Sequence, residues 1–159
     1  MASLTPRMQR VTDGVVSIRP PQPGDAAVLI AGRDAAFERW LGPGSPEPTP
    51  LACIEREGEV VGWIDVDTDR DWLDDGEVNI GYHLFSSAGG HGYATRAVML
   101  LLHHLSTGTK HHTATVLIDP SNERSLALVA RCGFEQRGLV GDQVLLARHL
   151  LDIDRLRST

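Results

Sequence analysis

The chain has 159 residues, of which 42% are hydrophobic and 23% are charged, with 16 Gly and 9 Pro. This length and composition are typical of one globular domain and exclude multidomain, fibrous and wholly disordered proteins. The net charge of −6 argues against a broad cationic surface for nucleic acid. The longest apolar run, 97–102, is too short to span a bilayer, and residues 1–10 lack the apolar centre of a signal peptide. We therefore expect a cytoplasmic protein without nucleic-acid or membrane partners.

The first half of the chain predicts a leader, a short strand, two helices and a hairpin. Residues 1–13 lack hydrophobic periodicity and are expected to form a loose leader, followed by a single domain over 14–152 and a tail at 153–159. Asp25 is placed as the N-cap of the first helix. The predicted elements are a strand at 15–19, a helix from Asp25, a short helix at 35–41, a proline-rich loop at 42–50, and hairpin strands at 51–56 and 59–67.

The second half alternates strands and helices. The strand at 77–85 carries Glu77, Asn79 and His83 on one face, because successive side chains of a strand point to opposite sides. The order mixes hairpins with β-α-β crossovers, so we expect an α+β fold with one mixed, mostly antiparallel, twisted sheet of about six to seven strands flanked by helices. The predicted elements are a strand at 77–85, a helix from about Gly92, a strand at 113–118, a helix at 122–131, and strands near 134–137 and 143–149.

No metal site or disulfide is expected. Cys53 and Cys132 lie far apart and form no C-x-x-C pair. The histidine pairs at 103–104 and 111–112 are adjacent in sequence, and neighbouring residues of a helix point about 100° apart. Neither pair has a carboxylate or cysteine at the spacing of a metal ligand set.

A glycine-rich loop between the strand at 77–85 and the next helix is the most informative segment. Gly89, Gly90 and Gly92 permit positive φ angles and a close backbone approach, and the first N–H groups of a helix are unpaired. Such a loop either holds a phosphate group or simply connects two elements. The dinucleotide pattern G-x-G-x-x-G is excluded because its last position is Thr95, and the P-loop lysine is absent.

This loop resembles the cofactor motif Q/R-x-x-G-x-G/A of the GNAT superfamily of acyl-CoA-dependent N-acyltransferases. Gly92 and Ala94 occupy the small positions, and Gly89 stands where Gln or Arg is usual. The run from Asn122 and Ser125 to Gly-Phe at 133–134, and the phrase NIGYHL at 79–84, are similar to the RimJ/RimL-like branch. Known members of that branch acetylate the N-termini of ribosomal proteins. The resemblance covers about residues 58–150 and implies a GNAT-like fold.

The resemblance also implies which residues hold acetyl-CoA. Asn122 lies beside the pantetheine arm, in a gap between the strands at 77–85 and 113–118, and also caps the following helix. Arg131 either meets a phosphate or complements the helix dipole. The backbone of His83, Leu84 and Phe85 binds the pantetheine arm, and the pyrophosphate is held by Gly89, Gly90, His91, Gly92, Tyr93, Ala94 and Thr95.

An amine must lose a proton before it attacks a thioester, and the departing thiolate must gain one. The branch usually has Glu where this chain has Asn79, so Glu77 on the same strand face is the first candidate base and His83 the second. Val129 stands where many relatives carry the Tyr that protonates the thiolate, which leaves Ser125 as the candidate acid. Each of these residues also has a purely structural interpretation, as a solvated strand residue or a first-turn hydrogen bond.

We therefore predict an N-acetyltransferase that moves an acetyl group directly from acetyl-CoA to a primary amine in a ternary complex. The amine is a protein N-terminus or a small molecule, and the short loop at 42–50 favours an open cleft for a peptide or bulky amine. The acidic stretch at 65–77 either attracts a cationic amine or is solvated. The alternative is a GNAT-like module that binds CoA or a small molecule without turnover. The sequence leaves open the acceptor, the acyl length and the oligomeric state, with a homodimer as one option.

Overall fold

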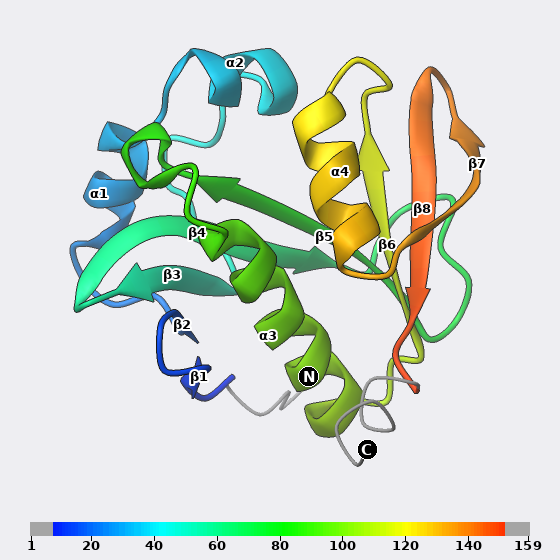
Figure 1. Ribbon diagram of the computed structural model, residues 1–159, viewed down its shortest axis with the longest axis horizontal. Coiled ribbons are helices and arrows are strands. Elements are labelled where there is room, and N and C mark those ends of the chain that lie inside the picture. Colours follow the sequence, from blue (N-terminus) through cyan, green and yellow to red (C-terminus); the bar gives the residue numbers. More distant parts are fainter. Residues whose placement is uncertain (1–7, 152–159) are drawn as a thin grey trace.

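The computed structural model describes residues 8–151, which form one sheet with helices on both faces (Figure 1). The spatial order of the strands is β1-β2-β3-β4-β5-β6-β8-β7. The strands are β1 (Val11–Thr12), β2 (Ser17–Arg19), β3 (Ala52–Arg56), β4 (Glu59–Asp67), β5 (Glu77–Leu84), β6 (Thr113–Ile118), β7 (Glu135–Val140) and β8 (Gln143–His149). The helices are α1 (Asp25–Ala31), α2 (Ala35–Leu41), α3 (Tyr93–Gly108) and α4 (Glu123–Arg131), with a 3-10 turn, η1, at Ser86–Ala88.

The sheet confirms the expected α+β class. Every neighbouring pair of strands is antiparallel except β5 and β6, which run parallel. It has eight strands rather than six or seven, because Val11 and Thr12 pair with Ile18 and Ser17 inside the segment expected to be a loose leader. Residues 1–7 of that leader and the expected tail at 153–159 lie outside the described residues. No helix within 8–151 combines the length and apolar character needed to cross a bilayer.

The two faces of the sheet carry different helices. Ile18 is fully buried in the main core with residues of α3 such as Leu101, whereas the next residue, Arg19, is bonded to Asp25 of α1 at 2.7 Å. Because neighbouring strand residues point to opposite faces, α1 lies on the face opposite to α3. Asp25 is therefore not the predicted N-cap. Gly24 occupies that position with φ 93°, and the Asp25 carboxylate pairs with Arg19 instead.

The strands β5 and β6 separate after a short parallel stretch. They pair only between residues 77–79 and 113–115. Beyond that point β5 continues beside β4, and β6 continues beside β8. The fold therefore contains the gap that the GNAT resemblance implies, between the C-terminal halves of these two strands.

Candidate active site

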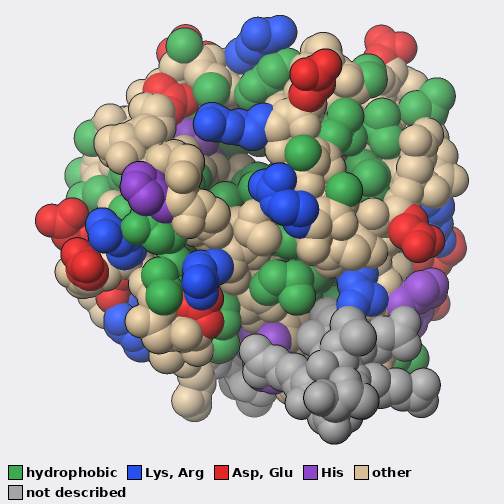
Figure 2. All heavy atoms as spheres, in the orientation of Figure 1, with side chains coloured by type: hydrophobic (Ala, Val, Ile, Leu, Met, Phe, Trp, Pro, Cys, Tyr) green, Lys and Arg blue, Asp and Glu red, His purple; other side chains and the backbone are tan. Residues whose placement is uncertain are grey.

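A cavity of about 770 Å³ lies at the gap between β5 and β6. Its walls come from α2, the second half of β5, the loop after η1, the first turn of α3, the end of β6, and α4. Figure 2 shows a hollow between the segment that follows β5 and α4, with Lys or Arg side chains at its rim. This volume falls within the range of ligand pockets, about 300–1,000 Å³.

The backbone of β5 is open on the side that faces the gap. The Phe85 N–H donates to the Val61 carbonyl at 2.7 Å, and the register with β4 is continuous from Gly62–Leu84 onward. Hydrogen-bonded and non-bonded pairs alternate along an antiparallel ladder, so the polar backbone groups of Tyr82 and Leu84 point away from β4. Past Asn79 no β6 residue is paired with them. A ligand with its own amide groups can bind there as an added strand would.

Two of the three glycines in the loop adopt the positive φ angles that glycine permits. Gly90 and Gly92 have φ of 82° and 76°, and a Cβ at either would meet no other atom within 4 Å. Gly92 is the N-cap of α3, and the first helical bond joins Arg96 N–H to the Gly92 carbonyl. The N–H groups of residues 93–95 therefore have no partner within the helix. These amides lie at the positive end of the helix dipole, beside the cavity.

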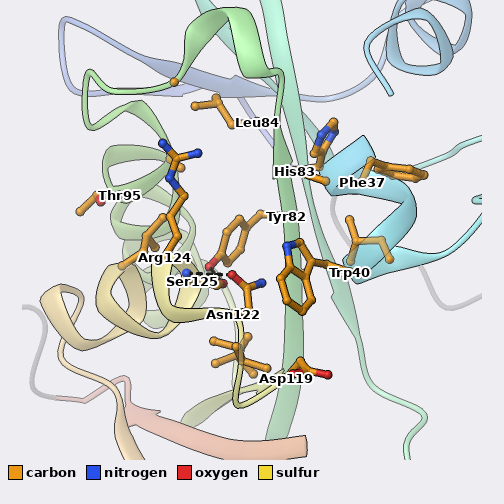
Figure 3. Close-up of a pocket in the computed structure, with 18 of the residues that line it drawn as sticks. Phe37, Trp40, Tyr82, His83, Leu84, Thr95, Asp119, Asn122, Arg124 and Ser125 are labelled. Atoms are coloured by element: carbon orange, nitrogen blue, oxygen red, sulfur yellow. Dashed lines mark hydrogen bonds between the residues drawn. The ribbon is translucent and has the colours of Figure 1, made fainter. Parts of the chain in front are cut away.

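Tyr82 and Ser125 meet on the α4 side of the cavity. The Tyr82 hydroxyl lies 2.5 Å from Ser125 Oγ, and the Ser125 N–H donates to Asn122 Oδ1 at 3.3 Å (Figure 3). Asn122 is thus the predicted N-cap of α4 and also lines the cavity. Burial raises the pKa of Tyr82 to about 12, against the hydrogen bond with Ser125, which lowers it. Tyr82 therefore stays protonated near neutral pH and can hold the Ser125 hydroxyl in place.

His83 occupies the opposite side of β5. Figure 3 shows Tyr82 projecting toward Ser125 and His83 toward α2. The imidazole is only 7% exposed and is surrounded by the rings of Phe37, Trp63 and Phe85, with centroids 5.0–6.4 Å away. Burial lowers the pKa of His83 below its ordinary value of 6.5, despite an opposing effect of Asp34. The ring is therefore neutral at pH 7 and able to accept a proton.

Glu77, the first candidate base, does not line the cavity. It begins β5, six residues before His83, which is about 20 Å along an extended strand. Its carboxylate accepts the Asp74 N–H at 3.0 Å and an N–H of the Arg137 guanidinium at 2.7 Å. Burial raises the pKa of Glu77, but these two hydrogen bonds outweigh it and hold the pKa below its usual range. A carboxylate that is engaged in this way is a poor proton acceptor.

The structure brings most of the other predicted residues to the same cavity. His91 is an exception, because its exposed ring stacks on Tyr93 at 5.2 Å and does not line the cavity. Tyr93 itself is buried, so the loop offers its backbone rather than this side chain. The predicted residues that line the cavity are His83, Leu84, Phe85, Gly89, Gly90, Gly92, Tyr93, Ala94, Thr95, Asn122, Ser125 and Arg131.

Several lining residues were not predicted as site residues. Tyr82 is partly buried against the hydrophobic core, and Asp34 is the N-cap of α2, with Oδ1 3.6 Å from His83 Nε2. Arg124, like Arg131, is an exposed cation of α4 that lines the cavity. A capping signal at Asp34 is readable in the sequence, but its contact with β5 depends on the tertiary fold. Nothing in the 65–77 stretch reaches the cavity, and Trp72 Nε1–H donates to Thr115 Oγ1 instead.

Comparisons with known proteins agree with this geometry. Residues 47–135, more than half of the chain, match the model of the acetyltransferase (GNAT) domain. The chain is similar to the solved structure of Mycobacterium smegmatis RimJ in complex with CoA-disulfide, with 25% identity, a TM-score of 0.73, and coverage of 91% of this chain and 89% of that one. No curated protein sequence matches the chain.

Two further solved structures share the fold at lower identity. The ribosomal-protein-S5-alanine acetyltransferase from Vibrio fischeri is 16% identical, with a TM-score of 0.76 and coverage of 91% of this chain and 98% of that one. The aminoglycoside acetyltransferase AAC(6')-Ib in complex with coenzyme A is 21% identical, with a TM-score of 0.74 and coverage of 89% and 99%. These two likenesses concern the fold alone.

Proposed function

The chain belongs to the GNAT acetyltransferase family, and from this premise we propose that it moves an acetyl group directly from acetyl-CoA to a primary amine. One observation carries the proposal: the open backbone of β5 and the unpaired first-turn amides of α3 border a single cavity. A linear amide arm fits the first feature, and a diphosphate fits the second. Neither cysteine is suited to be a nucleophile, because both are buried and burial raises the pKa of each thiol.

The residues present fit acetyl-CoA as co-substrate. The polar backbone groups of Tyr82 and Leu84 would bond the pantetheine amides, and the amides of residues 90–95 would hold the diphosphate. Arg124 and Arg131 would add positive charge on the α4 side. The bound co-substrate supplies an acetyl group activated as a thioester. The role of the protein is to hold that carbonyl between the two faces of the gap.

Residues on the two sides of β5 would carry out different proton transfers. His83 would take one proton from the acceptor ammonium, which frees a nitrogen lone pair. The nitrogen forms a C–N bond to the acetyl carbon and the C–S bond breaks. Ser125, held by Tyr82, would give a proton to sulfur and regain the second proton of the nitrogen. The products are an amide, a thiol and one proton, and no covalent enzyme intermediate is needed.

The acceptor is proposed to be a protein N-terminus or a bulky small-molecule amine. The similar solved structures include a RimJ, a ribosomal-protein-S5-alanine acetyltransferase and an aminoglycoside acetyltransferase. Phe37, Trp40 and Leu41 of α2 offer an apolar wall, and Asp34 and Asp119 add carboxylates that attract a cation. The same cavity is therefore suited to an amine carried on an apolar or extended group.

Calorimetry and a thiol-release assay test the proposal together. We expect acetyl-CoA and CoA to bind, and free thiol to appear when N-terminal peptides of ribosomal proteins, aminoglycosides or simple amines are added. Absence of binding at millimolar concentration would refute the acyltransferase function. Binding without thiol release from any amine would instead identify a CoA-binding module.

A further inference from the structure

The hydrogen bonding of the His83 ring is not explained by its packing. Both of its ring nitrogens are buried, and neither makes a hydrogen bond within the described part of the chain. Leaving a buried polar group unsatisfied costs about 1–3 kcal/mol, so such groups are rare unless they have a use. His83 is one of the residues that line the cavity. A ligand entering that cavity is therefore the natural partner of at least one ring nitrogen.

A carboxylate from another element lies beside this neutral ring. Oδ1 of Asp34 is 3.6 Å from His83 Nε2, which is beyond a normal hydrogen bond but within range of a strong charge interaction. Asp34 is held in place as the N-cap of α2, where Oδ1 accepts the Phe37 N–H at 2.8 Å. That hydrogen bond holds the pKa of Asp34 below its usual range, so the carboxylate remains ionised near neutral pH.

Building on the proposed acetyl transfer, we infer that Asp34 is a positioning residue for His83: it orients the imidazole and stabilises the imidazolium formed when the ring takes the acceptor's proton. Nε2 faces Asp34, so Nδ1 receives the proton that leaves the ammonium nitrogen. After transfer the proton passes to solvent, and the neutral ring is restored.

The charge balance around His83 supports a base of this kind. The charged groups that act on the ring are Asp34, which favours the imidazolium, and Arg33, which disfavours it. Arg33 is directed elsewhere, because its guanidinium donates to the Ser45 carbonyl at 2.6 Å and lies over the Phe37 ring. The rings packed around His83, those of Phe37, Trp63 and Phe85, carry no charge. Asp34 is thus the single group placed to compensate a positive charge on His83 among the described residues.

The test separates the charge of Asp34 from its capping role. Asn and Ser cap helices about as well as Asp, so Asp34→Asn and Asp34→Ser keep α2 capped while removing the carboxylate. Asp13→Asn is the matched control, because Asp13 also accepts backbone N–H groups and pairs with an arginine, Arg96, but does not line the cavity. The pKa of His83 is followed by NMR titration in the ligand-free full chain, with His83→Gln used to assign its signal.

We expect both Asp34 variants to lower the pKa of His83 further and the control to leave it unchanged. At pH 7, kcat/KM should fall at least about tenfold, and the acidic limb of its pH profile should move to lower pH. A lower rate with an unmoved limb, or an unchanged pKa of His83, would overturn the pairing while leaving acetyl transfer intact. Failure of the wild-type protein to release thiol with any amine would instead refute the proposed function, and the NMR titration would still decide whether Asp34 acts on His83.

Discussion

Two buried side chains on one face of β5, one at each end of the strand, differ in their hydrogen bonding. Glu77 and His83 both point to that face and are almost equally buried, at 6% and 7% exposure. At the first end, β5 is paired with β6, and Glu77 is bonded to Asp74 and Arg137. At the second end, β6 has separated, and neither nitrogen of His83 is hydrogen-bonded within residues 8–151.

This difference teaches that burial and strand face do not by themselves identify a base. A buried group whose hydrogen bonds are satisfied by its own protein stabilises the fold, whereas a buried group that lacks them is available to a ligand. Glu77 is satisfied by Asp74 from the loop before β5 and by Arg137 of β7, whereas no such partner reaches His83 among the described residues.

The comparison is tested most directly by replacing His83 and Glu77, one at a time, with glutamine. His83→Gln should lower kcat by about 10²–10⁴-fold, the usual contribution of general acid or base catalysis. Glu77→Gln should leave kcat within about threefold, while lowering the free energy of unfolding by about 1–3 kcal/mol, because the hydrogen bonds of a buried group are weakened. Thiol release and chemical unfolding measure the two effects. A large kcat loss in Glu77→Gln with His83→Gln active would reverse the assignment.

The pH profile extends the same contrast. The pKa of His83 lies below 6.5 in the folded protein, so activity should be constant near neutral pH and fall as pH drops through that lowered pKa. The unfolded chain binds more protons at this position in that window, so stability should also decrease as pH falls below about 6.5. The contribution of His83 is the part of this decrease that is absent in His83→Gln, measured by thermal unfolding at several pH values.

A smaller effect on kcat is expected from Ser125 and Tyr82, on the α4 side of the cavity. Ser125→Ala should lower kcat by about 10–100-fold with little change in KM for acetyl-CoA, because the departing sulfur loses its proton donor. Tyr82→Phe removes only the hydroxyl that holds Ser125 and should lower kcat by about tenfold. Steady-state kinetics separates kcat from KM. An equal rise of KM with unchanged kcat in both variants would mean that the pair binds the co-substrate and takes no part in proton transfer.

The sequence was sufficient for two local features of the site, although it misplaced the cap of α1 at Asp25. The cap at Asn122 depends on a residue three positions away, and the glycine loop depends on its own φ preferences, so both could be predicted. The alternation of β5 correctly placed Glu77 and His83 on one face. It could not show where along the strand β6 departs, because that depends on pairing between distant segments. Asp34 and Tyr82 were missed as site residues for the same reason.

The proposed binding of acetyl-CoA by the glycine loop can be tested with a matched pair of glycines. Gly90 and Gly58 have φ of 82° and 80°, and a Cβ at either would meet nothing within 4 Å. Gly90→Ala and Gly58→Ala should therefore cost similar backbone strain, about 1–2 kcal/mol. Only Gly90 lines the cavity, so only Gly90→Ala should weaken acetyl-CoA binding, by about tenfold in calorimetry. Equal affinities in the two variants would show that the loop amides do not hold the co-substrate.

The smallest expected effect concerns Asn122, where a local cap and a proposed ligand contact coincide. Asn122→Ala should lower the free energy of unfolding by about 1 kcal/mol, because the Ser125 N–H loses its acceptor. Asn122→Ser keeps a capping oxygen but shortens the side chain, so it should retain stability and yet weaken acetyl-CoA binding a few-fold. Unfolding and calorimetry on both variants separate the roles. If Asn122→Ser binds acetyl-CoA as tightly as the wild-type protein does, Asn122 acts only as the cap of α4. The co-substrate would then be bound by the backbone groups of β5 without this side chain.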